Sequence, residues 1–307
     1  MTVTLRKLQY FCALVDMKHF GRAAEKVSIS QPALSVQIRE LEHSLGVKLV
    51  ERKARDVLIT QIGQEVAIKA RAILNDVRDL SDAVRWSSGL SGRLNFGVIP
   101  SVAPYLLPIA LPLLRSRNIT LDLRVREAQT DQLLANLADG KLDAAVLALP
   151  VHTENLTSVT LFEDRFLLAG STERVGTFSS LQPSDVKPGQ LLLLDEGHCL
   201  ADQALEVCAL DRSQTRMDLG ASSLTTLCGL AAEGFGLTFL PEISLKTELS
   251  NGSNLRAKRF ASPEPRRTIG LVRRTLSGDD GWFSDLAEML TQAGKTLTDH
   301  ARAAYPI

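Results

Sequence analysis

Two of the four cysteines are placed so that they could form a redox switch. Cys199 follows a glycine-containing turn and opens a predicted helix, and Cys208 comes nine residues later. In the first turn of a helix, backbone N–H groups and the helix dipole favour the thiolate, the form of cysteine that attacks peroxides. We therefore expect a lowered pKa for the Cys199 thiol. Most free cysteines are small buried apolar residues, so the spacing alone also fits an inert pair.

The separation of these two cysteines indicates how oxidation would change the protein. Nine residues of helix span about 13 Å, whereas a disulfide needs Cα atoms roughly 4.4 to 6.8 Å apart. A helical segment between them must therefore unwind before they can bond. The apolar residues that would have to repack are Leu200, Ala204, Leu205 and Val207. Oxidation would then act as a conformational signal, with Cys199 forming a sulfenic acid that Cys208 resolves.

The remaining cysteines and the histidines indicate neither a metal nor a cofactor. Cys12 and Cys228 lie on apolar faces of predicted helices, where we expect core residues. No cysteine or histidine pair has C-x-x-C or H-x-x-x-H spacing, so no metal is expected. The N-terminus resembles no signal peptide, and no run of about 18 apolar residues occurs. We expect a cytoplasmic protein with no membrane partner.

Length and composition fit a globular protein of about two domains. The chain has 307 residues, of which 45% are apolar and 23% charged, and a chain of this length exceeds one typical domain. Lysine plus arginine number 35 and so do the acids. Residues 1–60, however, hold ten basic against six acidic side chains. This segment suits a phosphate-facing surface, although charge alone does not decide the point.

The first 60 residues predict a winged helix-turn-helix. Apolar spacing indicates a helix over residues 5–18 and a shorter one that stops near Ser28. Ser30 can cap a third helix, with Pro32 in its first turn and Gly46 as its terminator. Residues 48–60 then read as a hairpin with basic side chains near its tip, a candidate wing.

A long helix follows, capped by Thr60. Its apolar residues are spaced as a heptad seam: Val66, Ala70, Ile73, Val77, Leu80 and Val84. Such a seam needs a partner, either the same helix of a second copy or the chain's own effector domain. Residues 87–92 (SSGLSG) supply a flexible break.

Beyond the break, predicted strands alternate with predicted helices. We expect strands at residues 94–99, 120–126, 143–149, 166–169, 191–194, 237–240 and 268–273. Helices are expected at residues 131–139, 200–210, 224–233 and 282–293, and one more lies between the first two strands. This alternation is typical of a parallel sheet covered by helices.

Residues 20–35 (FGRAAEKVSISQPALS), 37–42 (QIRELE) and 45–52 (LGVKLVER) resemble the DNA-binding domain of the LysR family of bacterial regulators. The resemblance implies an α/β protein with a winged helix-turn-helix at 1–60, a dimerisation helix at 61–88 and a two-lobed, periplasmic-binding-protein-like regulatory domain at 92–307. Lobe I would comprise about 92–163 and 268–307, and lobe II about 164–267. Implied partners are double-stranded promoter DNA, RNA polymerase and further copies in a homodimer or homotetramer. The residues expected to contact DNA are Ser30, Gln31, Pro32, Ser35, Arg39, Arg52 and Arg55.

Four further segments resemble the OxyR-type peroxide sensors of that family: residues 99–108 (IPSVAPYLLP), 127–134 (EAQTDQLL), 195–203 (DEGHCLADQ) and 264–272 (EPRRTIGLV). This resemblance implies hydrogen peroxide as effector, a reversible Cys199–Cys208 disulfide, a cellular thiol reductant and control of antioxidant genes. The residues expected to bind or activate peroxide are Ser101, Thr130, His198 and Arg266. Ser101 stands where we expect a threonine, and either residue offers a hydroxyl.

Two rival interpretations stay open. The chain could be a LysR regulator that answers a small organic effector in the cleft between lobes, with both cysteines incidental. It could also be a thiol peroxidase, although the DNA-binding segment favours a regulator that is not an enzyme.

Overall fold

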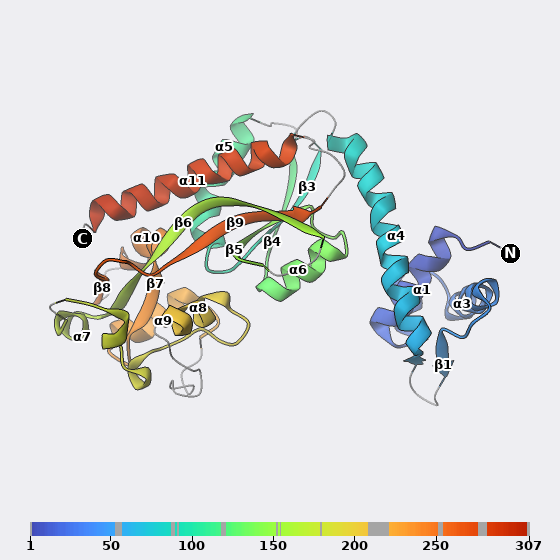
Figure 1. The fold of residues 1–307 in the computed structure, drawn as a ribbon, viewed down its shortest axis with the longest axis horizontal. Helices are drawn as coiled ribbons and strands as arrows, with labels where there is room; N and C mark the ends of the chain where they lie inside the picture. The colour runs from blue at the N-terminus through green and yellow to red at the C-terminus, as the bar shows by residue number, and fades with distance from the viewer. Residues whose placement is uncertain are drawn as a thin grey trace. The chain divides into compact units, whose positions relative to one another are not determined.

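The computed structural model describes residues 2–52, 57–86, 90, 92–117, 121–151, 153, 155–178, 180–207, 221–250, 254–275 and 281–305, with only the backbone given for residues 52, 78, 79, 81–86 and 207. The contacts divide the chain into two compact units, Met1–Val84 and Arg85–Ile307. Figure 1 shows the helices and strands of both units. No described helix is both long enough and apolar enough to cross a membrane.

The first unit begins with three helices, α1 (Leu5–Met17), α2 (Phe20–Lys26) and α3 (Gln31–Leu45). Ser30 caps α3 by accepting a hydrogen bond from the N–H of Ala33, and Pro32 lies in the first turn. Gly46 ends α3 in the left-handed conformation, with φ of 71°. The cap, the proline and the terminator expected from the sequence are thus confirmed.

A two-stranded antiparallel hairpin of β1 (Val50–Arg52) and β2 (Val57–Ile59) follows. The buried carboxylate of Glu42, in the last turn of α3, accepts hydrogen bonds from the backbone N–H groups of Leu49 (2.8 Å) and Val50 (3.2 Å). This carboxylate fixes the hairpin against α3. The expected hairpin is confirmed, while residues 53–56 at its tip lie outside the described residues.

The long helix α4 (Gln61–Trp86) starts as expected, because the Thr60 hydroxyl accepts a hydrogen bond from the N–H of Gly63. Its apolar residues divide into two groups. The residues buried in the core of the helix-turn-helix are Ala67, Ala70 and Leu74, with Val66 packed against it. The exposed residues on its later turns include Ile73, Val77 and Leu80. The expected single seam is therefore wrong for Val66 and Ala70, which serve their own domain, and the side chain of Val84 is not described.

The second unit is built on a seven-stranded sheet with the order β4-β3-β5-β9-β6-β7 and β8 paired to β6. Its strands are β3 (Arg93–Val98), β4 (Asp122–Glu127), β5 (Ala144–Leu149), β6 (Leu156–Ser171), β7 (Thr238–Pro241), β8 (Leu255–Arg259) and β9 (Arg266–Arg274). Only β3 with β4 and β3 with β5 run parallel among the described strands. The pairs β5–β9, β6–β9, β6–β7 and β6–β8 are antiparallel. The expectation of a parallel sheet is thus wrong beyond the first three strands.

The 16-residue strand β6 joins two groups of elements (Figure 1). Its first part pairs with β9, and its last residues pair with β7 and β8. We call the elements around β3, β4 and β5 the first lobe, and those around β7 and β8 the second lobe. The expected strand at 191–194 is present only as two isolated bridges, Leu191 to Leu237 and Leu194 to Ala221.

Helices cover both lobes. The first lobe holds α5 (Ala103–Arg117) and α6 (Thr130–Ala138). The second holds α7 (Thr172–Gly176), α8 (Cys199–Val207), α9 (Leu224–Ala232), α10 (Leu245–Leu249) and the 3₁₀ turns at Pro183–Asp185, Pro188–Gln190 and η4 (Glu242–Ser244). The last helix, α11 (Trp282–Ala304), runs along β6 (Figure 1) and packs closely enough that a Cβ on Gly294 would lie 2.1 Å from the Phe162 ring.

Candidate redox site and nucleic-acid interface

A small pocket brings Cys199 together with three of the four residues expected to bind peroxide. The parallel strands β3 and β4 end at the same edge of the sheet, where Ser101 lies in the turn after β3 and Thr130 begins α6 after β4. This is where open α/β sheets place ligand groups. The second lobe supplies His198 and Cys199 at the start of α8. The pocket is lined by Ile99, Pro100, Ser101, Gln129, Thr130, Gly197, His198, Cys199 and Leu200.

The turn before Cys199 is held tightly against α6. Gly197 has φ of 87°, a conformation that L side chains rarely adopt, and a Cβ there would lie 2.5 Å from Oε1 of Gln129. The Gln129 side chain donates a 3.1 Å hydrogen bond from Nε2 to the carbonyl oxygen of Glu196. Because Gly197 has no side chain, Gln129 of the first lobe can pack against the turn that precedes Cys199 in the second lobe.

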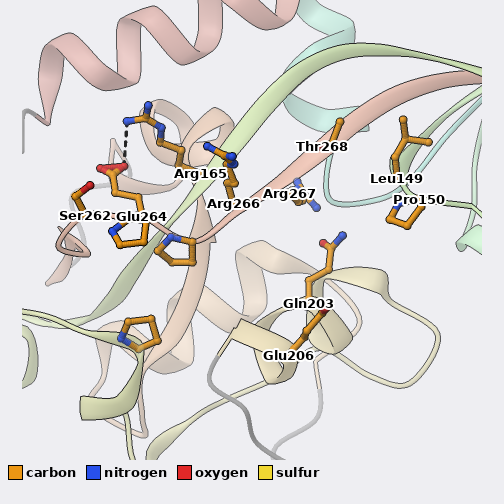
Figure 2. Close-up of a pocket in the computed structure, with 13 residues that line it drawn as sticks. Leu149, Pro150, Arg165, Gln203, Glu206, Ser262, Glu264, Arg266, Arg267 and Thr268 are labelled. Atoms are coloured by element: carbon orange, nitrogen blue, oxygen red, sulfur yellow. Dashed lines mark hydrogen bonds and ion pairs between the residues drawn. The ribbon is translucent and has the colours of Figure 1, made fainter.

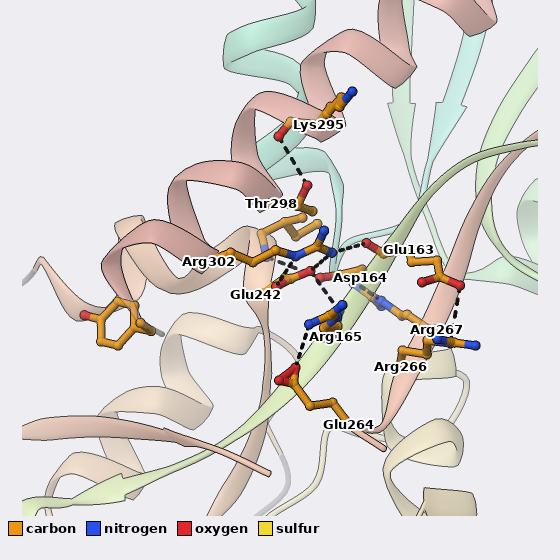
Figure 3. Close-up of polar contacts among 12 residues, drawn as sticks. Glu163, Asp164, Arg165, Glu242, Glu264, Arg266, Arg267, Lys295, Thr298 and Arg302 are labelled. Carbon is orange, nitrogen blue, oxygen red and sulfur yellow. Dashed lines mark hydrogen bonds and ion pairs between the residues drawn. The ribbon is translucent and has the colours of Figure 1, made fainter. Parts of the chain in front are cut away.

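Arg267, on β9, supplies the cation that was expected at Arg266. It donates from Nη1 to Ser101 Oγ (2.8 Å) and from Nη2 to the Ser101 carbonyl oxygen (3.2 Å). Its Nε donates to Asp164 Oδ2 at 2.9 Å, and both side chains of this ion pair are fully buried. Figure 3 shows Asp164 and Arg267 next to a second cluster, in which Arg302 of α11 binds Glu242.

Arg266 does not line the Cys199 pocket, and the cation that acts on the thiol is its neighbour Arg267, which binds the pocket residue Ser101. The side chain of Arg266 is 60% exposed and pairs with Glu163 (Nε to Oε1, 3.3 Å). Both arginines line a separate open pocket of about 820 Å³, together with Gln203 of α8 (Figure 2). Strand alternation explains why Arg266 is exposed while Arg267 is buried, because successive side chains of β9 point to opposite faces. The signal was present in the sequence: Arg267 has the same parity as the apolar Ile269 and Leu271.

Burial decides the pKa of the Cys199 thiol. Desolvation raises this pKa, and the charge of Arg267 and the hydroxyl of Thr130 lower it to a smaller extent. The net direction is upward, so the expected low-pKa thiolate is wrong for the structure as it stands. The helix start favours the anion, but the apolar surroundings disfavour it more strongly.

Two hydroxyl groups in the Cys199 pocket, those of Thr130 and Ser101, can still form hydrogen bonds to a ligand. The buried Oγ1 of Thr130 meets no partner among the described residues within full hydrogen-bond geometry. Ser101 Oγ accepts from Arg267 and keeps its own hydrogen to donate. Burial also lowers the pKa of His198, against the smaller effects of Asp195 and Glu127, which favours the neutral imidazole. Donors and acceptors thus line the same pocket as the thiol.

The other cysteines are placed differently. Cys12 on α1 and Cys228 on α9 are buried, as expected. Desolvation, followed by the charge of Glu248, raises the pKa of Cys228. Cys208 lies outside the described residues. Within the described part of the chain, no group of three His, Cys, Asp or Glu side chains could hold a metal ion.

The candidate nucleic-acid interface is α3. Gln31, Pro32 and Arg39 are exposed on it, and Ser35 is half-buried. Arg39 Nε donates to the Ser35 carbonyl oxygen at 3.4 Å, and Ser30 is engaged as the cap. The side chain of Arg52 and the whole of Arg55 lie outside the described residues.

Known proteins match nearly the whole chain. The profile of the bacterial regulatory helix-turn-helix proteins of the lysR family matches residues 5–64, and that of the LysR substrate binding domain matches residues 87–295. The chain is 38% identical over 301 residues to the hydrogen peroxide-inducible genes activator of Haemophilus influenzae, covering 97% of this chain and 99% of that protein. It is 40% identical over 290 residues to the DNA-binding transcriptional dual regulator OxyR of Escherichia coli, covering 94% and 95%.

Solved structures of OxyR proteins also match this chain. A full-length OxyR variant from Pseudomonas aeruginosa matches with a TM-score of 0.71 and 29% identity, over 96% of this chain and 95% of that one. An H2O2-bound OxyR cysteine variant from Corynebacterium glutamicum matches with a TM-score of 0.67 and 33% identity, over 99% and 96%. By sequence along nearly its whole length and by fold, the chain belongs to the LysR family of bacterial helix-turn-helix regulators, in its group of OxyR-type hydrogen peroxide-inducible genes activators.

Proposed function

We propose that the chain is a hydrogen-peroxide-sensing, DNA-binding transcription regulator of antioxidant genes, switched by a reversible Cys199–Cys208 disulfide. The observation that carries this proposal is the pocket in which Cys199 meets Ser101, Thr130 and His198. The relatives named for hydrogen peroxide and the H2O2-bound structural neighbour support it.

The chemistry needs only the thiols, the peroxide and a place for protons. The Cys199 sulfur attacks one peroxide oxygen, the O–O bond breaks, and the departing hydroxide takes the thiol proton to leave as water. Thr130 and Ser101 would orient the peroxide through their hydroxyls, and neutral His198 can accept or relay the proton. The Cys208 thiol would then attack the sulfenic acid, forming the S–S bond and releasing a second water. A cellular thiol reductant would return two electrons to reset the pair.

The helix α8 turns this bond into a conformational change. Cys199 and Val207 stand at its two ends, about 12 Å apart at about 1.5 Å per residue. Adjacent Cα atoms are about 3.8 Å apart, so Cys208 cannot come within about 8 Å of Cys199 while α8 stays helical. A disulfide needs roughly 4.4 to 6.8 Å. Closing the bond therefore requires α8 to unwind, and the buried Leu200, Ala204 and Leu205 must repack.

The proposed output is altered binding to promoter DNA. The helix α3 would enter the major groove, with Gln31, Pro32, Ser35 and Arg39 toward the bases and phosphates and the wing residues Arg52 and Arg55 toward phosphate. We propose a homotetramer of linker-helix dimers that contacts RNA polymerase. Its parts are the DNA-binding domain (1–60), the linker helix (61–88) and the regulatory domain (92–307), with lobe I at about 92–163 and 268–307 and lobe II at about 164–267.

Mass spectrometry with differential thiol labelling tests the proposal. After a small peroxide dose, a Cys199–Cys208 link should appear while Cys12 and Cys228 stay labelled as free thiols. Cys199→Ser protein, treated in parallel, should form no link. An unchanged labelling pattern at both cysteines in the wild type would refute the switch. Sustained peroxide turnover in a reductant-coupled assay would favour a thiol peroxidase instead.

A further inference from the structure

Val36 is an exposed apolar side chain at the centre of the outward face of α3. It is 40% exposed, although it lies in the middle of the helix. At 3.6 residues per turn, Val36 points about 160° away from both Leu34 and Ile38. These two side chains are buried in the core of the first unit. Val36 therefore projects directly away from the domain that supports the helix.

Neither the fold nor helix formation explains a valine at this position. It is not part of the buried core of the unit. In an exposed helix position, β-branched valine is a weaker helix former than alanine. Its neighbours on the same face include the exposed Pro32 one turn earlier and, one turn later, the exposed Arg39 and the half-buried Glu40, which pairs with Lys7. The apolar group thus stands in the middle of the surface that would meet the DNA.

The chemistry of the side chain selects its partner in the groove. Valine can neither donate nor accept a hydrogen bond, so it cannot read the polar edges of guanine, cytosine or adenine. The apolar feature that the major groove offers is the C5-methyl group of thymine. We propose that Val36 packs against one thymine methyl group and thereby specifies one A·T base pair of the DNA site. This inference rests on the proposed DNA-binding function of α3.

The test removes the thymine methyl group and the Val36 side chain separately. Full-length protein first selects its sites from a randomised duplex pool. Each thymine of a selected duplex is then replaced in turn by deoxyuridine, which lacks only the methyl group. At one thymine per half-site the affinity of the wild type should fall about fourfold, as expected for one buried methyl-sized group. Val36→Ala protein should bind the thymine and deoxyuridine duplexes equally well at that position.

A matched control lies on the same helix. Leu45 is 38% exposed, nine residues further on, and about 180° around the helix from Val36. Leu45→Ala protein should keep the full wild-type pattern of methyl sensitivity. Because alanine is the better helix former, Val36→Ala protein should fold at least as stably as the wild type, which thermal unfolding verifies.

The outcomes separate this inference from the function on which it rests. A protein that selects no sequence above the random background would overturn the proposed DNA-binding function. If the wild type selects a site, but its sensitivity to every thymine methyl group is matched by that of the Val36→Ala protein, only the assignment of Val36 is overturned.

Discussion

Arg267 and Ser101 are joined by two hydrogen bonds, one to the hydroxyl and one to the carbonyl oxygen of the serine. Ser101 lies in the turn after β3, and Arg267 lies on β9 with its charge neutralised by buried Asp164. One side chain therefore holds a wall of the Cys199 pocket and also lowers the pKa of the thiol. A substitution of Arg267 should therefore change both the stability of the redox site and the reactivity of Cys199.

Arg267→Ala should destabilise the regulatory unit by about 3–5 kcal/mol, because it leaves the buried Asp164 carboxylate without its partner. The same variant should react more slowly with peroxide. Arg266→Ala is the matched control, since Arg266 is mostly exposed and its ion pair with Glu163 is worth less than about 1 kcal/mol. Urea unfolding of both variants measures the difference. Equal losses of stability would contradict the assignment of Arg267 as the buried cation.

The rate of Cys199 oxidation should rise with pH through the neutral range. Only the thiolate attacks peroxide, and burial holds the pKa of this thiol above its ordinary value. Below that pKa the thiolate fraction grows about tenfold per pH unit. Stopped-flow oxidation of Cys208→Ala protein between pH 6 and about pH 8.5 should therefore show no plateau. A plateau near neutral pH would mean that Arg267 and the helix start outweigh burial, as the sequence had suggested.

The pKa of Cys199 was predicted with the wrong sign because its burial could not be predicted from the sequence. The helix-opening position of Cys199 was readable from the glycine turn before it, and the capped helix of the DNA-binding domain from Ser30 and Pro32. Burial of the thiol depends on two lobes meeting around it, and local sequence does not show that contact. The choice between Arg266 and Arg267 was within reach, because the parity of Ile269 already pointed to Arg267.

The strand pairing was harder to foresee for a related reason. The first part of β6 carries exposed residues and lacks a clear apolar alternation, so only its last, fully buried residues were predicted. Its partner β9 is antiparallel and returns from the far end of the domain. Likewise, Ala70 of α4 fits a heptad seam by spacing but is buried within its own domain. Periodicity identifies an apolar face and leaves its partner open.

Gly197→Ala should slow Cys199 oxidation and destabilise the second unit by about 1–3 kcal/mol, because the residue has positive φ and its Cβ would meet Gln129. Gly229→Ala is the control, since a Cβ there meets nothing within 4 Å and the residue lies inside α9. That substitution should leave stability unchanged or raise it by about 1 kcal/mol. Thermal unfolding and peroxide titration of the two variants check the contrast. A fully active, fully stable Gly197→Ala protein would show that the close approach is not needed.

The exposed residues Ile73, Val77 and Leu80 of α4 should form the surface for a second copy of the helix, since their spacing leaves an apolar stripe in a lone unit. Replacing Val77 and Leu80 by Asp should shift the protein toward monomer in light scattering at micromolar concentration. Ile68 is 67% exposed but lies off this stripe, so Ile68→Asp should keep the wild-type mass. A wild type that is already monomeric would rule out this surface.

The last prediction concerns the division of labour between the two thiols. Cys199 shares its pocket with the Thr130 hydroxyl, which is available to bind peroxide, so Cys208→Ala protein should still be oxidised at Cys199. The product should be trapped by a sulfenic-acid reagent and seen by mass spectrometry, and the intramolecular link and the persistence of the signal should be lost. Cys199→Ser should abolish the response altogether.

Cys228→Ser supplies the control, because Cys228 is buried on α9 and its pKa is raised by burial, so its loss should leave the switch intact. DNase footprinting with and without peroxide reads all three variants on one scale. If Cys199→Ser protein still changed its footprint on peroxide treatment, the thiol switch would be wrong. The chain would then be a regulator that answers a small effector between the lobes. Such an effector would fit only if the small pocket at Cys199 opened, because Gln129, which precedes α6, lies close against Gly197.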